Sequence, residues 1–522
     1  MITIKLTDNK VFGWCQADSV SAKGYCFAPD GKLYRGADLC SYFTDAATVD
    51  DFRRKLLSAN GLFSVVIQRN NSTWIGVDRF RHFPLFYRQK ENKLIVADAV
   101  DDLFDDDEPK ELDAESCTVF SGLSYVLGNK TLIKNVFQVQ AGEYLIYDGH
   151  PVTTSYYYRY FAPIRDMGFE EAGQQLKTIL KRIGERMSRL IGDRPVLLSL
   201  SGGLDSRLIA YLLKINKIKN VTCFTYGIEE GNPEWQRSKA VADKLGFQWV
   251  FVDYSKINSP NFYEKKQFLD YAHYAAQYVV KFGITPYFAA DKFINEMKIS
   301  PDTVLLLGYG GDYFSGKHLK PYMRHYRSVS AIAKDLQYAH CDLVKLNIRE
   351  RRLIRRIIKN SLDAKVFPLF ANVEDWIVKR RYPNIYSGKL WEFHEIETQT
   401  PLCDTELMDF FEALPFEYRL NQKLYKTVLS ELFEKFDIHF STPEVPHQNV
   451  TLQRIKIYIK RILPFLRLRH DLFCLDYFDM KRFLKPVLAE VYKKEPKKKI
   501  LSYNGIISEW YLMKLKKRLK TS

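Results

Sequence analysis

The sequence lacks several features that would assign it to a broad class at once. It contains no uninterrupted apolar run that approaches the ~20 residues of a membrane-spanning helix. Its 8 cysteines are scattered without CxxC spacing, so we expect neither a disulfide framework nor a zinc site. Residues Met1 to Gln16 are interrupted by polar side chains and form no apolar core of a signal peptide. These absences predict a protein of the reducing cytoplasm without a transmembrane segment.

Positive charge is abundant but unevenly placed. The formal net charge is +16 at pH 7, and residues 451–522 hold 19 Lys and Arg against 6 Asp and Glu. An acidic run lies elsewhere, at 98–115. No nucleic-acid-binding motif accompanies the basic segment, so we expect no nucleic-acid partner. The basic segment predicts a solvated helical face, with a peripheral contact to an anionic surface as the alternative.

Short strand patterns fill the first ~150 residues. They lie at 1–6, 62–67, 73–77, 85–88 and 93–97. Turn residues at 70–71 and 91–92 join the last four strands into two predicted hairpins. Strands at this spacing predict layered sheets rather than βαβ units. Turn signals at 148–151 predict a domain boundary before residue 166.

Beyond this boundary, predicted strands and helices alternate. Helical patterns lie at 169–190, 208–213, 233–245 and 271–282. Short apolar strands lie at 196–200, 221–226, 248–252 and 304–307. This alternation predicts a parallel α/β sheet, and the chain past Gly316 reads as almost wholly helical.

The most informative segment is SGGLDS at 201–206, which joins a predicted strand to a predicted helix. Its two glycines let the backbone approach an anion closely, and the helix N-terminus offers free N–H groups. Ser201 and Ser206 add hydroxyl donors. Asp205 would be repelled by a phosphate unless a cation lay between them, so it implies Mg²⁺. The segment predicts a phosphate cradle, with a strand-to-helix turn that holds no ligand as the alternative.

The SGGLDS segment resembles the pyrophosphate-loop ATPases, and specifically the asparagine synthetase family. The resemblance implies that this loop holds the pyrophosphate part of ATP. It also implies a reaction in which a carboxylate is adenylated, pyrophosphate leaves, and an amine then displaces AMP. Residues 224–227 look like the adenosine-contacting segment of that family. The ATP-binding residues that the resemblance implies are Ser199, Ser201, Gly202, Gly203, Asp205, Ser206, Thr225, Tyr226, Gly227 and Gly308.

A second segment, GYGGD at 308–312, is similar to the other metal-binding loop of that family. The similarity implies that Asp205 and Asp312 bind Mg²⁺ together, because a metal neutralises the leaving pyrophosphate. The alternative for Asp312 is a turn aspartate among glycines. The two aspartates are therefore the predicted metal ligands.

Tyr309 stands where asparagine synthetases have glutamate and where β-lactam synthetases have tyrosine. The similarity predicts that Tyr309 helps to deprotonate an attacking amine. An aromatic side chain packed beside the loop is the alternative. The glutamate that partners this tyrosine in β-lactam synthetases is not assigned, and Glu350 is a candidate only by its distance along the chain.

Two later features also resemble the family. Residues 397–404 are similar to a segment that carries an arginine where this chain has Gln399, so substrate contacts there are left open. Lys426 lies 29 residues beyond Glu397 and matches a lysine that stabilises the adenylate and the transition state. A helix-surface lysine is the alternative. Lys426 and Tyr309 are the predicted catalytic residues.

The N-terminal part resembles the class II glutamine amidotransferase domain of the same family. The resemblance rests on residues 78–87, with shorter matches at 97–99, 131–133 and 141–143. Glutaminase chemistry needs a cysteine exposed as the mature N-terminus, whereas residue 2 is Ile2. Asp30 would place an anion where the reaction must stabilise one. We therefore expect a retained scaffold without glutaminase activity.

The sequence predicts an α/β protein in three parts. Residues 1–160 are expected to form an Ntn-type αββα domain of layered sheets like a class II glutamine amidotransferase. Residues 161–440 are expected to form a pyrophosphate-loop ATPase domain with a parallel sheet and a mostly helical end. Residues 441–522 are expected to form a basic helical extension.

The predicted reaction is amide formation from a small-molecule or peptide carboxylate and an amine or ammonia, with ATP and Mg²⁺ as cofactors. Two alternatives stay open: an intramolecular cyclase like β-lactam synthetases or lasso-peptide cyclases, and a non-catalytic relative that only binds nucleotide. A homodimer is a further option for the assembly.

Overall fold

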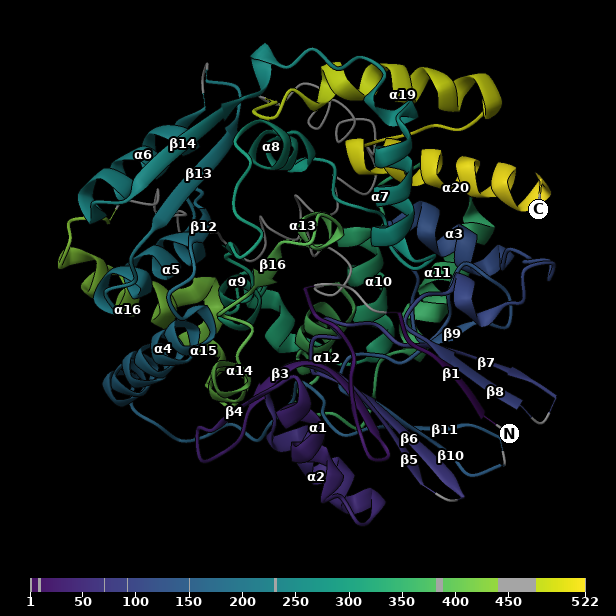
Figure 1. Ribbon diagram of the computed structural model, residues 1–522, viewed down its shortest axis with the longest axis horizontal. Coiled ribbons are helices and arrows are strands. Elements are labelled where there is room, and N and C mark those ends of the chain that lie inside the picture. The colour runs from purple at the N-terminus through teal and green to yellow at the C-terminus, as the bar shows by residue number, and fades with distance from the viewer. Residues whose placement is uncertain are drawn as a thin grey trace.

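The computed structural model describes residues 2–7, 11–69, 71–91, 93–149, 151–229, 232–381, 388–439 and 476–521. Figure 1 shows the N-terminal sheets in purple and blue at the lower right and the parallel sheet in teal at the upper left. The yellow C-terminal helices lie at the upper right.

Two stacked sheets form the N-terminal part. One has the order β1-β8-β7-β9, and the other has the order β11-β10-β6-β5-β3-β2, with β4 paired to β3. The strands are β1 Ile2–Lys5, β2 Cys15–Ala17, β3 Val20–Phe27, β4 Leu33–Arg35, β5 Asn60–Arg69, β6 Ser72–Val77, β7 Phe86–Lys90, β8 Lys93–Ala97, β9 Phe137–Gln138, β10 Glu143–Tyr147 and β11 Thr153–Tyr156. A shared core that includes Val66, Ile75, Tyr87 and Val96 fills the space between the sheets.

Helices cover the outer faces of these sheets. α1 Ala37–Thr44 and α2 Val49–Ser58 pack on the larger sheet, and α3 Ala114–Leu123 lies on the side of the smaller one. This αββα arrangement confirms the predicted fold class. Both predicted hairpins are present as antiparallel pairs, β5 with β6 and β7 with β8. Their turn residues Asn70 and Asn92 lie outside the described residues.

A five-stranded parallel sheet forms the centre of the second part. Its order is β14-β13-β12-β15-β16. The strands and their helices are α4 Phe169–Ile191, β12 Val196–Ser199, α5 Leu204–Ile215, β13 Val221–Gly227, α6 Pro233–Leu245, β14 Gln248–Asp253, β15 Val304–Leu306 and β16 Glu397–Gln399. Leu198 faces one hydrophobic core and Leu197 faces the other, so the sheet is covered on both sides, as its apolar strands require.

Most of the remaining described chain is helical. These helices are α7 Lys266–Ala276, α8 Tyr287–Asp291, α9 Gly311–Phe314, α10 Val329–His340, α11 Ile348–Asn360, α12 Ala371–Trp376, α13 Lys389–Phe393, α14 Thr405–Glu412, α15 Phe416–Arg419, α16 Lys423–Glu434, α19 Met480–Lys494 and α20 Tyr503–Thr521. Part of the predicted basic extension, 440–475, lies outside the described residues. None of the helices that the structure describes is long and apolar enough to span a bilayer.

The helix predicted at 271–282 is wrong in its C-terminal half. α7 ends at Ala276, because Gln277 and Tyr278 adopt left-handed backbone angles with φ of +43° and +57°. The chain then runs beside 124–126: Val126 N donates to Val279 O, and Lys281 N donates to Ser124 O. Tertiary pairing therefore overrides an apolar pattern that suits a helix equally well.

Polar contacts join the N-terminal part to the parallel-sheet part. The buried Glu397 carboxylate accepts hydrogen bonds from Arg35 of β4 at 2.8 Å and from Arg194 at 2.6 Å. The Tyr158 hydroxyl donates to Glu412 Oε2 at 2.8 Å. These buried contacts fix how the two parts sit against each other.

Candidate functional site

The SGGLDS loop connects the end of β12 to the start of α5, as the sequence predicts. Ser201 N donates to Ser206 Oγ at 3.1 Å, and Ser206 Oγ donates to Ser201 O at 3.0 Å. Gly203 N donates to Ser201 Oγ at 3.2 Å. The two serines therefore hold the loop in shape, and the first turn of α5 points its free N–H groups out of it. Ser199 precedes the loop and pairs with Phe224 of β13.

The GYGGD loop packs directly against the SGGLDS loop, because β15 and β12 are parallel neighbours. A methyl group on Gly308 would lie 2.8 Å from Ser206 N. On Gly311 it would lie 2.5 Å from Asp205 Oδ1 and closer still to the Tyr425 hydroxyl. Only glycine fits at these two positions, so the second loop is shaped by the first.

Asp205 and Asp312 come together at this contact. Asp312 N donates to Asp205 Oδ2 at 3.0 Å, and the Tyr425 hydroxyl donates to Asp205 Oδ1 at 2.9 Å. Burial, and then the nearby Asp312 carboxylate, raise the pKa of Asp205 to about 7. Asp312 is partly exposed, forms an ion pair with Lys317, and accepts a hydrogen bond from Gln422.

This pair of carboxylates fits Mg²⁺. Magnesium in nucleotide sites is held by one or two carboxylates together with phosphate oxygens and water. A cation between Asp205 and Asp312 would relieve the repulsion that raises the pKa of Asp205. In the described part of the chain, no group of three or more His, Cys, Asp or Glu side chains is arranged to hold a metal ion. The two loops therefore supply only part of the metal's ligands, and phosphate oxygens and water would supply the rest.

One face of α16 and of the turn before it lies over the paired loops. Gln422, just before α16, donates to Asp312, Tyr425 donates to Asp205, and Lys426 is the next residue of α16. Lys426 is half-buried and makes no hydrogen bond or ion pair with a described residue. Gln422 and Tyr425 were missed by the sequence reasoning, because their contacts with the loops depend on where α16 packs.

A further cation was also missed. Arg237 of α6 packs against Gly202: a methyl group on that glycine would lie 3.3 Å from the Arg237 Cδ atom. Arg237 is half-buried and also lowers the pKa of Arg207 by its charge. A guanidinium beside a glycine-rich loop is suited to bind phosphate oxygens.

The segment 225–227 ends β13 next to the same loops. The Thr225 hydroxyl donates to Leu200 O at 2.5 Å, so it supports the backbone just before the SGGLDS loop. Gly227 has φ of +133°, and a side chain there would collide with Tyr477 O. Ile228 N donates to that same oxygen at 2.8 Å, and the Phe478 ring lies 5.6 Å from the Tyr226 ring. The start of the C-terminal extension therefore covers the predicted adenosine-contacting segment.

Tyr309 is half-buried and lies between the two hydrophobic cores. Its carbonyl faces Cys403. Burial, and to a smaller extent the nearby Tyr309, raise the pKa values of Tyr226 and Tyr271. Glu350 has another role: it closes a capping box with Asn347 at the start of α11. The structure thus gives Glu350 no contact with Tyr309.

The segment 397–404 divides into two halves. Glu397 pairs with Val304 at the start of β15, so it lies at the opposite end of the sheet from the SGGLDS loop. The later residues do reach the site, since Leu402 O lies 2.7 Å from a methyl group placed on Gly310. Glu397 therefore joins the two parts of the protein, and only the end of this segment supports the GYGGD loop.

The N-terminal residues considered for glutamine hydrolysis have structural contacts in the described part of the chain. Ile2 pairs with Leu94 inside the smaller sheet. Asp30 closes its own turn by accepting a hydrogen bond from Lys32 N at 2.8 Å. Cys26 is fully buried, and burial raises the pKa of its thiol, which suppresses the reactive thiolate.

Two protein families match the chain. Residues 185–439 match the family described as asparagine synthase, and residues 52–158 match the family described as glutamine amidotransferase domain. No curated protein matches the chain. The first family match contains the SGGLDS loop, the GYGGD loop and Lys426.

Solved structures give only distant similarity. One is glutamine phosphoribosylpyrophosphate amidotransferase from B. subtilis complexed with ADP and GMP, with 10% identity, a TM-score of 0.19 and coverage of 59% of both chains. Another is the allosteric regulatory enzyme of purine biosynthesis, with 9% identity, a TM-score of 0.18 and coverage of 56% of this chain and 55% of that one. The chain thus spans less than two thirds of the length of either.

Proposed function

The chain belongs to the asparagine synthetase family of ATP-dependent amide ligases, and on that premise we propose that it adenylates a carboxylate and converts it to an amide with an amine or ammonia. Pyrophosphate is released in the first half of this reaction and AMP in the second. The observation that carries the proposal is the contact between the two loops, which brings Asp205 and Asp312 together at the N-terminus of α5.

Binding of the triphosphate falls to the loop and its neighbours. The N–H groups at the start of α5 bind phosphate oxygens, and Arg237 adds positive charge on the outer side of the loop. Asp205 and Asp312 would hold Mg²⁺, which would supply positive charge to the leaving pyrophosphate. The hydrogen bonds from Tyr425 and Gln422 fix the orientation of these carboxylates.

Two residues act on the carboxylate and the amine. Lys426 follows Tyr425 in α16, and its proposed role is to stabilise negative charge that develops at the phosphorus and at the acyl oxygen. Tyr309 orients the amine and takes part in the removal of its proton. These roles assign one side chain from the helix α16 and one from the loop after β15.

The amine does not come from glutamine hydrolysed by this chain. Support comes from the buried Cys26, which stays protonated, and from Asp30, which accepts a hydrogen bond from Lys32 N in its own turn. The proposed amine is free ammonia or an amine-bearing substrate, and the amidotransferase-like part serves as a scaffold that buries Glu397 and Glu412.

The first experiment measures pyrophosphate and AMP while the protein is supplied with ATP, Mg²⁺, ammonium and a pool of carboxylic acids. We expect both products in equal amounts, and a loss of about 100-fold or more in Asp205→Asn. Release of ADP and phosphate instead would overturn the proposal. The residue Asp243, exposed on α6, provides a matched control as Asp243→Asn with unchanged rates.

A second experiment addresses the amine donor and the intramolecular alternative. Glutamine is expected to give no product where ammonium or an amine does, and Ile2→Ala is expected to leave the rate unchanged. Mass spectrometry of the product then distinguishes a gained amine from the loss of water that marks an intramolecular amide. This second readout is needed because Tyr309 stands where β-lactam synthetases have tyrosine.

A further inference from the structure

A cavity of about 490 Å³ lies between the N-terminal part and the parallel-sheet part. Cavities of this size accommodate small metabolites. Phe12, Lys23 and Asp98 line it from the N-terminal part, whereas Tyr274 and Lys281 line it from the other part. None of the residues of the SGGLDS or GYGGD loops lines it, so it is separate from the proposed ATP site.

The acidic side chains that line this interdomain cavity have partners in the structure. Asp101 accepts a hydrogen bond from Tyr278 and pairs with His273, Asp102 accepts one from the Thr7 hydroxyl, and Asp270 accepts one from Lys266. Asp98 accepts hydrogen bonds from Trp14 Nε1 at 2.7 Å and Thr7 N at 2.9 Å, and lies 3.5 Å from Lys23 Nζ. Glu392 accepts a hydrogen bond from Lys389 Nζ at 2.6 Å and contacts His82. These charges therefore compensate one another inside the wall.

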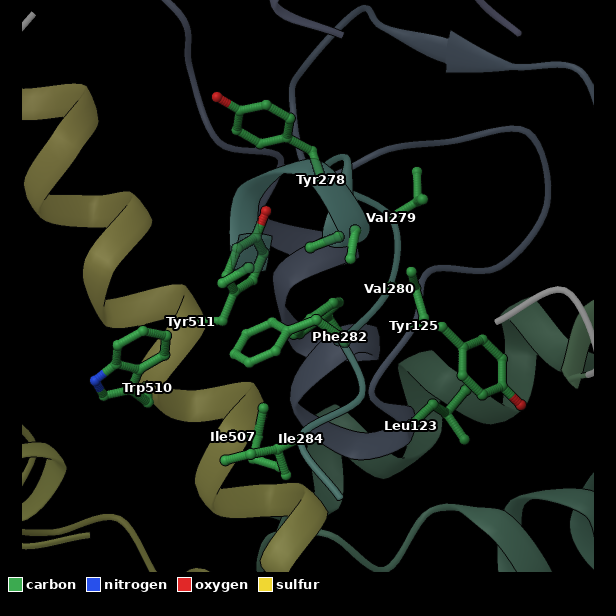
Figure 2. Close-up of a cluster of buried hydrophobic side chains, with 14 of the residues drawn as sticks. Leu123, Tyr125, Tyr278, Val279, Val280, Phe282, Ile284, Ile507, Trp510 and Tyr511 are labelled. Carbon is green, nitrogen blue, oxygen red and sulfur yellow. The ribbon is translucent and has the colours of Figure 1, made fainter. Parts of the chain in front are cut away.

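Lys281 differs from the other lysines of the cavity wall. It follows α7 in the segment that runs beside 124–126, and its backbone N–H donates to Ser124 O at 2.8 Å. Figure 2 shows Phe282 and Ile284 of this segment pointing towards Ile507 and Trp510 of α20. Lys281 lines the cavity next to Phe282, which also packs in that apolar cluster.

The Lys281 ammonium makes no hydrogen bond or ion pair with any residue that the structure describes, although it is half-buried. Burial alone lowers its pKa to about 8. A buried cation without a partner is costly, and a bound anion removes that cost. A carboxylate is well suited, because it accepts charge-assisted hydrogen bonds from an ammonium group.

We propose that the interdomain cavity is a second ligand site, which binds a small carboxylate-bearing metabolite through an ion pair with Lys281. The aromatic rings of Phe12, Phe83 and Tyr274 give the rest of the ligand an apolar surface. Because the ligand contacts both parts, it also strengthens their association. The proposal is independent of the ligase reaction, since it needs neither ATP nor the paired loops.

Protection from chemical labelling tests the site in the full chain without ATP. The protein is acetylated briefly at pH near 8 with succinate, malate, glutamate, inorganic phosphate or neutral succinamide, and each lysine is measured by mass spectrometry. We expect at least one carboxylate to reduce labelling of Lys281 about tenfold, with no change at exposed Lys265 and no effect of succinamide. Absence of protection by every carboxylate, or protection by phosphate alone, overturns the proposal.

Variants separate the ion pair from a structural effect. Calorimetric binding of the protecting carboxylate is expected to weaken about tenfold or more in Lys281→Met, and to be retained in Lys281→Arg and in the control Lys265→Met. Thermal unfolding without ligand reports whether Lys281→Met is folded. Equal binding by wild type and a folded Lys281→Met would refute the assignment of Lys281.

Discussion

Three glycines set the closest approaches in the proposed ATP site. Gly308 lies against Ser206, Gly310 against Leu402, and Gly311 against Asp205. Each contact is too short for a side chain, so the distance between the paired loops depends on these residues. The consequence is that the two carboxylates are positioned by backbone packing rather than by flexible side chains.

Gly311→Ala tests this close packing. The added methyl group would force apart Asp205 and Tyr425, so we expect a loss of about 100-fold in the rate of pyrophosphate release and a stability loss of about 1–3 kcal/mol. Gly168→Ala is the control, because it has open space and ordinary backbone angles. A fully active Gly311→Ala would show that the loops are not held by this contact.

Glu412 connects the two parts by a buried hydrogen bond and gives the stability a pH dependence. Burial raises its pKa to about 8, above its value in the unfolded chain. The folded protein therefore holds a proton that the unfolded chain gives up. The resulting stabilisation is present below about pH 4.3 and is lost as the pH rises through about 8.

Glu412→Gln retains an acceptor for Tyr158 but cannot ionise. Above pH 8 the variant is expected to be more stable than wild type by on the order of 2 kcal/mol, and this gain is expected to vanish near pH 4.5. Urea unfolding of both proteins across this range measures the difference. Exposed Glu434→Gln is the control, and its free energy of unfolding is expected to follow that of wild type at every pH. If the free energies of unfolding of Glu412→Gln and wild type differ by the same amount at every pH, Glu412 does not hold the proton.

At the scale of elements, the extension after residue 475 supports the end of β13. Tyr477 O accepts from Ile228 N, and Arg482 of α19 donates to Tyr254 O. Phe478 packs on Tyr226, which in turn stacks on Tyr254 at 5.5 Å between ring centroids. These contacts hold one wall of the proposed adenosine site from outside the matched family region.

Phe478→Ala is therefore expected to weaken ATP binding about tenfold with a smaller change in turnover. The physical reason is that Tyr226 and Gly227 lose the surface that holds them. Calorimetric titration with a non-hydrolysable ATP analogue measures the effect, with Tyr492→Ala on the exposed side of α19 as control. Unchanged affinity of Phe478→Ala for the ATP analogue would show that the extension does not support the proposed ATP site.

Sequence patterns predicted the elements around the proposed ATP site well, since strands and helices around residues 196–253 carry strong local signals. Pro233 and its capping residue Asn232 mark the start of α6, for example. The short strand β16 was missed, because three residues carry too little pattern. α7 was predicted too long, because the apolar residues after Ala276 pack in an extended segment.

At the scale of the whole molecule, Glu397 and its two arginines connect the amidotransferase-like part with the parallel sheet. Sequence reasoning could not predict this ion pair, because Arg35 and Glu397 are 362 residues apart and neither lies in a charge pattern. The two glycine-rich loops were easier to locate, because they carry their own local signature. Tyr425 and Gln422 became visible only once α16 was placed over those loops.

Glu397→Gln is expected to destabilise the protein by about 2 kcal/mol, since Arg194 and the half-exposed Arg35 lose their counter-ion in a partly buried place. Denaturant unfolding measures this loss. The surface pair Arg324 and Glu417 offers the comparison, because Glu417→Gln is expected to cost less than about 1 kcal/mol. Equal effects of the two substitutions would mean that Glu397 does not hold the two parts together.

The central claim is that ATP is cleaved between its α and β phosphates to adenylate a carboxylate. Exchange of labelled pyrophosphate into ATP measures this half-reaction directly, because it needs a carboxylate but no amine. The account predicts exchange that depends on a carboxylate from the supplied pool, is lost in Asp205→Asn, and needs no glutamine. Exchange that is absent with every carboxylate, or that persists in Asp205→Asn, would contradict it.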